Sequence, residues 1–324
     1  MTKAKFLVPM FVFVALMAAL AFAGTPQPAK IKVGESPNFV ALSRDGKLAY
    51  VTCYAKDEID IVNLEGKKVV DRLYPGEGPL GIVLTPLGDK AYVALDKSRV
   101  VAVIDLQSRR VTDSIKVGGA PSVVAVNPKG YRVYATNFGT RSDNGYLDVI
   151  ETSRNQIVKS IPLGGRPIGV TVAPDGSRIF VINGASSELL FIDDNTLQIE
   201  KRLQVGENPD GLAVSPDGKR LFVANSRSND LSVIDLVFGR LLINIPVEKA
   251  PFGVAVSADN RWVYVANTKS HTVSKVSAQL NSVDTQSIKV GKGPVSVVLS
   301  PDGRFLIVAN ELSGNISVIP ISNN

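Results

Sequence analysis

Three observations predict an all-β fold, a single seven-bladed propeller with four-stranded antiparallel blades. Seven similar units of about 42 residues follow one another, a complete unit holds four short apolar runs separated by turn residues, and no stretch repeats with the 3.6-residue period of a helix. One such unit cannot bury its apolar residues alone, so the units are expected to pack around a ring. Prolines after Gly-rich turns mark the units at spacings of 42, 42, 46, 42, 42 and 43 residues: Pro37, Pro79, Pro121, Pro167, Pro209, Pro251 and Pro294.

The fifth unit shows the four expected strands most clearly, over residues 211–215, 220–225, 231–235 and 241–247. Its first corner is Pro216-Asp217-Gly218, in which Pro presets φ, Asp accepts a turn hydrogen bond and Gly takes a left-handed conformation. This combination is typical of a hairpin. An Asp or Asn at the end of the third strand is expected to brace the next turn rather than to act in catalysis: Asn63, Asp105, Asp193 and Asp235.

The seventh unit lacks a fourth strand, because the chain ends soon after its third strand at residues 316–319. The missing strand has a counterpart at the other end of the chain, since Ile31-Lys32-Val33-Gly34 repeats the fourth-strand endings at 115–118 and 288–291. We therefore expect the N-terminal strand to complete the seventh blade, close the ring and cover its edges.

The first 23 residues have the pattern of an export signal. Two lysines precede an apolar run from Phe6 to Ala23, which closes with Ala21-Phe22-Ala23. Cleavage after Ala23 would leave residues 24–324 as the propeller, with a net charge of +4 and no transmembrane span. The alternative is a retained membrane anchor, because the run approaches the length of the shortest spanning helix. The protein is expected to be periplasmic, or secreted and at the cell surface.

Cys53 is the only cysteine, so it cannot form a disulfide within its own chain. It lies in the apolar stretch 48–54. We interpret it as a buried small hydrophobic residue, with a free reactive thiol as the alternative.

The ends of the second strands resemble the YVTN β-propeller repeat family, which includes surface-layer-like proteins. The motif recurs together with the Pro-Asp-Gly corner and a Val-Ile-Asp strand at fixed offsets, from Lys30 to the C-terminus. The resemblance implies an exported or surface-associated seven-bladed propeller without an assigned reaction. Cys53 and Leu95 depart from the Asn of the motif, so their blades lack its hydrogen bonds. The matching segments are 50–53, 134–137, 222–225, 264–267 and 307–310.

The composition removes most catalytic sites, because one His and one Cys provide neither a zinc cluster nor a CxxC pair. We predict no catalytic residue, no metal and no cofactor. The only histidine, His271, is expected in a solvated loop of the sixth unit. The residue after each repeat proline should face the mouth of the central channel, and only Asp210 among them is ionisable: Asn38, Leu80, Ser122, Ile168, Asp210, Phe252 and Val295.

Glycines two residues after the repeat prolines do not indicate a phosphate loop, because no helix follows them. Crowding of main chains near the ring axis explains them better. They are Gly81, Gly169, Gly211 and Gly253.

These features predict a non-catalytic binding or scaffold protein that contacts another exported or cell-envelope protein. The contact is expected at the channel mouth, where Phe252 would be an aromatic anchor and Asp210 and Arg166 would set orientation. Asn38 and the long loop of the third unit, Arg141–Tyr146, would lie beside them, although a neutral surface insertion is the favoured interpretation of that loop, because loops tolerate changes in length. The alternative is a propeller enzyme of the lactonase or the quinone- or haem-linked oxidoreductase type.

One basic residue in each unit stands at the start of the second strand, and together these residues would form a ring on the opposite rim. Weak binding of a polyanion is one interpretation of this ring. Interspersed aspartates favour the other, a solvated rim of mixed charge. The residues are Lys47, Lys90, Arg132, Arg178, Arg220, Arg261 and Arg304.

Overall fold

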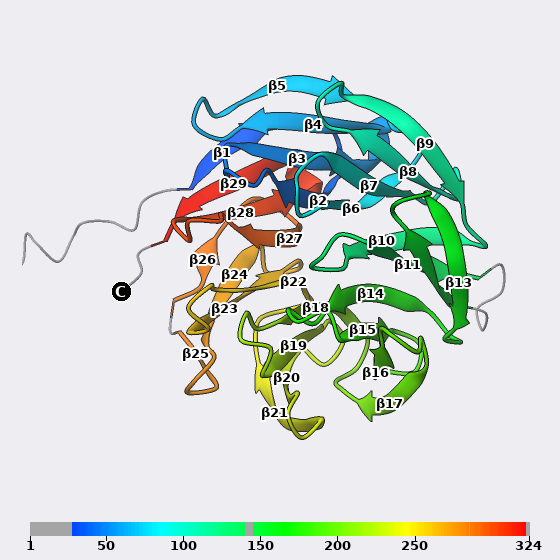
Figure 1. Cartoon of the computed structure of the whole chain (residues 1–324). Coiled ribbons are helices and arrows are strands. Elements are labelled where there is room, and N and C mark those ends of the chain that lie inside the picture. The colour runs from blue at the N-terminus through cyan, green and yellow to red at the C-terminus, as the bar shows by residue number, and fades with distance from the viewer. Residues whose placement is uncertain (1–27, 140–144, 285, 322–324) are drawn as a thin grey trace, which may run out of the picture.

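Seven antiparallel sheets surround a common centre in the computed structural model, which describes residues 28–139, 145–284 and 286–321 (Figure 1). Six sheets have four strands, and in the sixth blade the outer strand is divided into two short pieces. The predicted seven-bladed all-β propeller is confirmed. The expected signal peptide, residues 1–23, lies outside the described residues.

The blades are numbered in chain order, and each is built from the ring axis outward. The innermost strands are β2 (Pro37–Leu42), β6 (Pro79–Leu84), β10 (Ala120–Val126), β14 (Pro167–Val172), β18 (Pro209–Val214), β22 (Pro251–Val256) and β27 (Pro294–Leu299). The second strands are β3 (Leu48–Cys53), β7 (Lys90–Leu95), β11 (Arg132–Phe138), β15 (Arg178–Asn183), β19 (Arg220–Asn225), β23 (Trp262–Asn267) and β28 (Phe305–Asn310).

The third strands are β4 (Glu58–Asn63), β8 (Val100–Asp105), β12 (Tyr146–Glu151), β16 (Glu188–Asp193), β20 (Asp230–Asp235), β24 (Thr272–Ser277) and β29 (Asn315–Pro320). The outer strands are β5 (Lys68–Leu73), β9 (Arg110–Lys116), β13 (Gln156–Pro162), β17 (Ile199–Gln204), β21 (Arg240–Pro246), the pair β25 (Ser282–Val283) and β26 (Ile288–Lys289), and β1 (Ala29–Lys32). Two 3₁₀ turns, η1 (Tyr54–Lys56) and η2 (Glu311–Ser313), join second to third strands in blades 1 and 7.

Because the strands alternate in direction, the connections gather on two faces. We call the face with the Pro-Asp-Gly hairpins the corner face. The opposite face carries the loops that enter the inner strands and those that join second to third strands, and we call it the loop face. The hairpins form as predicted: in blade 5 the N–H of Gly218 donates to the Ser215 carbonyl at 2.8 Å and the N–H of Lys219 donates to Asp217 Oδ1 at 3.1 Å.

The residues that end the third strands brace the following turns, as expected. Asn63 Oδ1 accepts the N–H of Gly66 at 2.6 Å, and Asp235 Oδ1 accepts the N–H of Val237 at 2.9 Å. Asp105 and Asp193 accept turn N–H groups in the same way. These side chains therefore stabilise turns on the corner face.

The N-terminal strand closes the ring. β1 pairs antiparallel with β29, with Ile31 opposite Ile316, so the blue and red ends of the chain lie in one sheet (Figure 1). Ile31 is 4% exposed, and the N–H of Val33 donates to the Gly314 carbonyl at 3.1 Å. The next residue, Gly34, connects this strand to blade 1, because its N–H donates to Asp60 Oδ2 at 2.9 Å. The predicted closure is confirmed.

The inner strands approach each other closely at the glycines after the repeat prolines. A Cβ on Gly211 would lie 1.9 Å from the Phe252 carbonyl oxygen of the next blade, and one on Gly253 would lie 2.7 Å from that of Val295. Gly81 faces main-chain atoms of β10 in the same way, whereas Gly169 is crowded by side chains. Close approach of main chains therefore explains Gly81, Gly211 and Gly253, as predicted, whereas the prediction is wrong for Gly169, whose neighbours are side chains.

The Asn of the second-strand motif donates to the third strand of its own blade. Asn225 Nδ2 lies 2.8 Å from Ser232 Oγ, and Asn137 Nδ2 lies 2.9 Å from Asp148 Oδ2. In blade 2 Leu95 replaces the Asn, and Ala102 replaces the Ser as a member of the same buried apolar cluster. Blade 2 therefore lacks both the Asn donor at position 95 and the hydroxyl acceptor at position 102, so no polar group of this pair is left without its partner.

A buried carboxylate joins blades 3 and 4. Asp194, 3% exposed, accepts hydrogen bonds from the hydroxyl groups of Tyr131 and Tyr134 and from Asn127 Nδ2, and pairs with Arg132 Nη1 at 3.2 Å. Its partners lie some 60 residues earlier in the chain. Multiple partners at one buried carboxylate compensate its loss of water.

Candidate functional site

A hollow of about 430 Å³ opens on the loop face between blades 5 and 6. It contains two of the predicted binding residues, Asp210 and Phe252, which hold the same position at the start of β18 and β22. We call it the loop-face hollow. Its lining residues are Asn208, Asp210, Ser226, Arg227, Ala250, Phe252, Thr268 and Lys269.

Asn208 holds Asp210 in place and connects it to Arg166. Asn208 Nδ2 donates to Asp210 Oδ2 at 2.8 Å and to Ser226 Oγ at 2.7 Å. Its Oδ1 accepts a hydrogen bond from Arg166 Nη2 at 3.0 Å. The predicted pair, Asp210 and Arg166, is thus brought together through a residue that the sequence analysis did not single out.

Asn208 occupies a position that suits its side chain and main chain. Its φ of 51° is left-handed, a conformation that Asn tolerates better than most residues. It directly precedes a repeat proline, where the other units have Ser36, Gly78, Ala120, Arg166, Ala250 and Gly293. That contrast in the sequence could have pointed to Asn208.

Burial raises the pKa of Asp210, while hydrogen bonding by Ser226, the charge of Arg166 and hydrogen bonding by Asn208 oppose the shift. The desolvation of the carboxylate outweighs its favourable contacts. Asp210 can therefore accept hydrogen bonds from a ligand and bind a proton more readily than an exposed aspartate.

Phe252 is half-buried, and it packs against the apolar cluster that includes Val295. It therefore forms part of the floor of the hollow and also covers the seam to blade 7. Asn38 is the second residue of β2 in blade 1 and is not among the residues that line the hollow. Arg141 lies outside the described residues, so its predicted place beside the site stays a prediction.

His271 lies between β23 and β24 of blade 6, as expected, but it is half-buried and hydrogen-bonded rather than simply solvated. Its Nδ1 accepts the N–H of Gly293 at 3.1 Å, which joins blades 6 and 7. The same ring nitrogen lies 3.1 Å from the Thr268 carbonyl oxygen.

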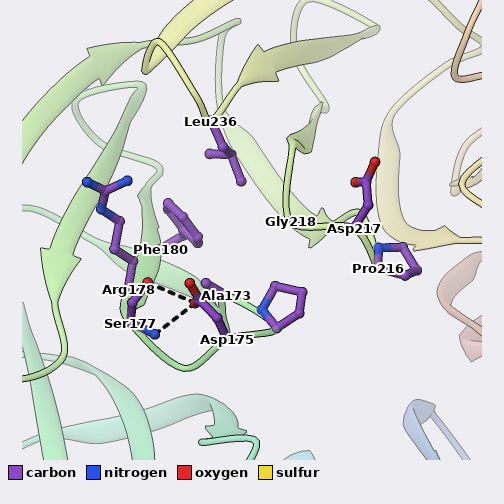
Figure 2. Close-up of a pocket in the computed structure, with 10 residues that line it drawn as sticks. Ala173, Asp175, Ser177, Arg178, Phe180, Pro216, Asp217, Gly218 and Leu236 are labelled. Carbon is purple, nitrogen blue, oxygen red and sulfur yellow. Dashed lines mark hydrogen bonds between the residues drawn. The ribbon is translucent and has the colours of Figure 1, made fainter.

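The predicted basic ring lies at the corner face. A smaller hollow of about 210 Å³ opens there between blades 4 and 5. Figure 2 shows Arg178 and Asp175 on one side of this hollow and Asp217 on the other. Several members of the ring already have partners within the protein: Arg132 with Asp194, Arg178 with Glu200, Arg220 with the Ala278 carbonyl and Arg304 with Asp302. These contacts fit a rim of mixed charge, and polyanion binding there stays a prediction.

Within residues 28–139, 145–284 and 286–321, no three His, Cys, Asp or Glu side chains gather as metal ligands. In the same part of the chain no helix has the length and apolar character needed to cross a membrane. What the loop-face hollow offers is one carboxylate, several hydrogen-bonding groups, two cationic side chains and an aromatic floor.

The fold and this hollow define a seven-bladed propeller with a candidate site at the loop face. Residues 245–324 match the family described as lactonase, 7-bladed beta-propeller. No curated protein matches the chain. Among solved structures, hydrazine synthase of Kuenenia stuttgartiensis is similar, with a TM-score of 0.83 and 23% identity over 94% of this chain and 99% of that one. At this identity the likeness shows the shared fold.

Proposed function

We propose that this propeller is an exported binding protein that contacts another exported or cell-envelope protein at the loop-face hollow. The observation that carries the proposal is the hollow itself, in which Asp210 and Phe252 lie together between two neighbouring blades. A partner side chain that enters it meets an aromatic floor and a carboxylate already oriented by Asn208.

The rigidity of the ring favours binding. Both inner strands that carry the site are held in four-stranded or longer sheets, and the loops around them are joined by main-chain hydrogen bonds, such as that from Ser226 to the Asn208 carbonyl at 3.0 Å. A site built in advance loses little conformational entropy when a partner binds.

The test uses the tagged mature protein to capture partners from the exported fraction. Proteins retained by the wild type and lost with Phe252→Ala and with Asp210→Ala would support the proposal. Asp302→Ala on the corner face is the control, and circular dichroism checks that every variant is folded. Equal capture by wild type and both site variants would place the contact elsewhere.

Lactone hydrolysis is the second candidate, and the family match favours it because residues 245–324 include Phe252, Thr268 and Lys269 of the hollow. Asp210 would act as the general base that activates water, and Lys269 would stabilise the oxyanion. A panel of γ- and δ-lactones followed by acid release decides between the two. Hydrolysis that is lost in Asp210→Asn would make the protein a lactonase. The likeness to hydrazine synthase is one of fold and carries no redox chemistry to this chain.

A further inference from the structure

Blades 5 and 6 contain the same pair of loops, but the loops of blade 5 carry an acidic and a basic side chain, whereas those of blade 6 carry two lysines. In blade 5 the N–H of Arg227 donates to the Glu207 carbonyl at 3.2 Å, and the two side chains form an ion pair at 3.8 Å. In blade 6 the N–H of Lys269 donates to the Lys249 carbonyl, also at 3.2 Å. Two ammonium groups therefore stand where blade 5 has a guanidinium and a carboxylate.

Blade 7 adds a third lysine on the neighbouring loop. Lys292 lies two residues before its repeat proline, as Lys249 does, whereas blades 1, 2 and 5 have a glutamate at this position: Glu35, Glu77 and Glu207. The loops of blades 6 and 7 are joined, because Thr268 Oγ1 donates to the Pro294 carbonyl at 2.8 Å and Gly293 donates to His271. We call Lys249, Lys269 and Lys292 the lysine triad.

The lysine triad is exposed, and among the described residues no carboxylate oxygen lies within 4.0 Å of its three Nζ atoms. The neighbouring Glu248 is occupied by the hydroxyl of Thr272 at 2.6 Å and by that of Ser287. Glu311, the first residue of η2, also lies beside the blade 7 loop, because its N–H donates to the Gly293 carbonyl at 2.8 Å. Like charges on adjacent loops repel each other, and an external anion would remove that repulsion.

Lys269 connects the triad to the loop-face hollow, because it lines the hollow together with Ala250 and Phe252. The surface therefore combines a cationic rim with an apolar floor. Asp210 lies within the hollow, where Asn208 donates a hydrogen bond to its carboxylate and the positive charge of Arg166 acts against its negative charge. A ligand complementary to this surface carries several carboxylates next to one apolar side chain.

We propose that the lysine triad and the loop-face hollow dock an acidic segment of a partner protein, with glutamate or aspartate side chains on the triad and one apolar side chain over Phe252. This rests on the proposed binding function and gives its partner a chemistry. The charge complementarity would speed association and make the affinity depend on salt, as is general for charged interfaces.

The test measures fluorescence anisotropy of a short labelled peptide of glutamates around a single phenylalanine, added to the mature protein. We expect saturable binding that weakens about tenfold in Lys249→Glu, because the substitution replaces an attraction by a repulsion. Lys249→Glu also recreates the acid–base pair of blade 5, so its thermal midpoint should equal or exceed that of the wild type. Lys219→Glu on the corner face makes the same charge change and should leave peptide affinity unchanged.

Two results would overturn the inference. Equal affinity of wild type and Lys249→Glu for the peptide would show that the triad does not take part. Equal affinity for a glutamate peptide without phenylalanine, or for a heparin fragment, would identify a general polyanion surface instead of a docking site for an acidic protein segment.

The two proposals can fail separately. Envelope partners that are lost with Phe252→Ala but retained by Lys249→Glu would preserve the proposed function and remove the acidic partner. Partners that are insensitive to both substitutions, together with no peptide binding, would remove both.

Discussion

The N–H of Gly293 donates to Nδ1 of His271 at 3.1 Å across the seam between blades 6 and 7. Other seams use different acceptors at the same place: Asp57 accepts the N–H of Gly78 at 2.8 Å, and Asn229 accepts that of Ala250 at 2.8 Å. The only histidine of the chain is therefore one of several side chains that link consecutive blades.

Replacement of His271 should follow this role. His271→Ala leaves the Gly293 N–H without its acceptor, and we expect the free energy of unfolding to fall by about 1 kcal/mol. His271→Asn provides an amide oxygen like that of Asn229 and should keep most of that stability. Denaturant unfolding measures both variants. Equal stabilities of the Ala and Asn variants would contradict a hydrogen-bonding role.

Gly211→Ala should be among the most damaging single substitutions in the chain. The new Cβ would lie 1.9 Å from the Phe252 carbonyl oxygen, so two inner strands must separate, at a cost of about 3 kcal/mol. Gly118→Ala is the matched control, because its Cβ would meet nothing within 4 Å. Thermal melts compare them, and similar midpoints would refute the close approach.

Asp210→Asn should stabilise the protein at neutral pH. The pKa of Asp210 is raised by burial, so the folded carboxyl binds its proton more tightly than the unfolded one, whose pKa is 3.8. Stability is therefore lost as pH rises from about 4 through the folded pKa, and the loss is complete above it. We expect Asp210→Asn to raise the melting midpoint at pH 7 by about 1–2 °C and to give no gain at pH 3.

Asp302 is the control for this prediction, because its pKa is shifted in the opposite direction to that of Asp210. Hydrogen bonds from Ser300 and Arg304 lower its pKa to about 2. Its contribution is present above pH 4 and is lost as pH falls through the folded pKa, so Asp302→Asn should lower the midpoint at pH 7. Calorimetry over pH 3–7 records both variants, and a shared direction would contradict this reasoning.

Ring closure should require the first described strand. Deleting residues 24–35 exposes β29 and opens blade 7, and Ile31→Asp places a charge in a position that is 4% exposed. Each change should lower stability by about 3 kcal/mol or more and favour aggregation. Lys32→Asp alters an exposed side chain of the same strand and is the control. Unchanged melting and solubility after the deletion would show that the segment is dispensable.

Cys53 should be unreactive until the protein unfolds. The residue is fully buried, and burial followed by the charges of Asp60 and Glu58 raises the pKa of its thiol to about 12. A thiol reagent such as dithionitrobenzoate should give no colour with native protein and one thiol per chain in guanidinium. Rapid labelling of native protein would contradict the burial.

Comparison of the repeats in the sequence predicted the structural features that recur from blade to blade. Blade number, the corners, the braces at Asn63 and Asp235, and closure by residues 31–34 all follow from comparing one unit with the next, because the same local contacts recur in each. The sequence also assigned Asp210 and Phe252 to equivalent positions in neighbouring inner strands, where the structure has them, since each follows a repeat proline.

Contacts between blades were missed. Asp194 accepts a hydrogen bond from Tyr134, which lies some 60 residues earlier in the chain, and nothing in the local sequence pattern indicates that pair. Asn208 was overlooked because its role depends on Arg166 from the preceding blade. The difference between Glu207–Arg227 and Lys249–Lys269 was present in the sequence, but the adjacency of each pair becomes visible only when the loops are placed in space.

The pairing of β1 with β29 also orders the events of folding. Ile31 and Ile316 lie at almost opposite ends of the chain, and contacts between such distant positions form slowly because their loop-closure entropy is large. Blades 1 to 6 contain their own four strands and can assemble as the chain emerges, while blade 7 must wait for the last strand to be synthesised. A partly synthesised chain of this protein is therefore an open arc with unpaired strands at both ends, and it remains prone to aggregation until β29 emerges and pairs with β1.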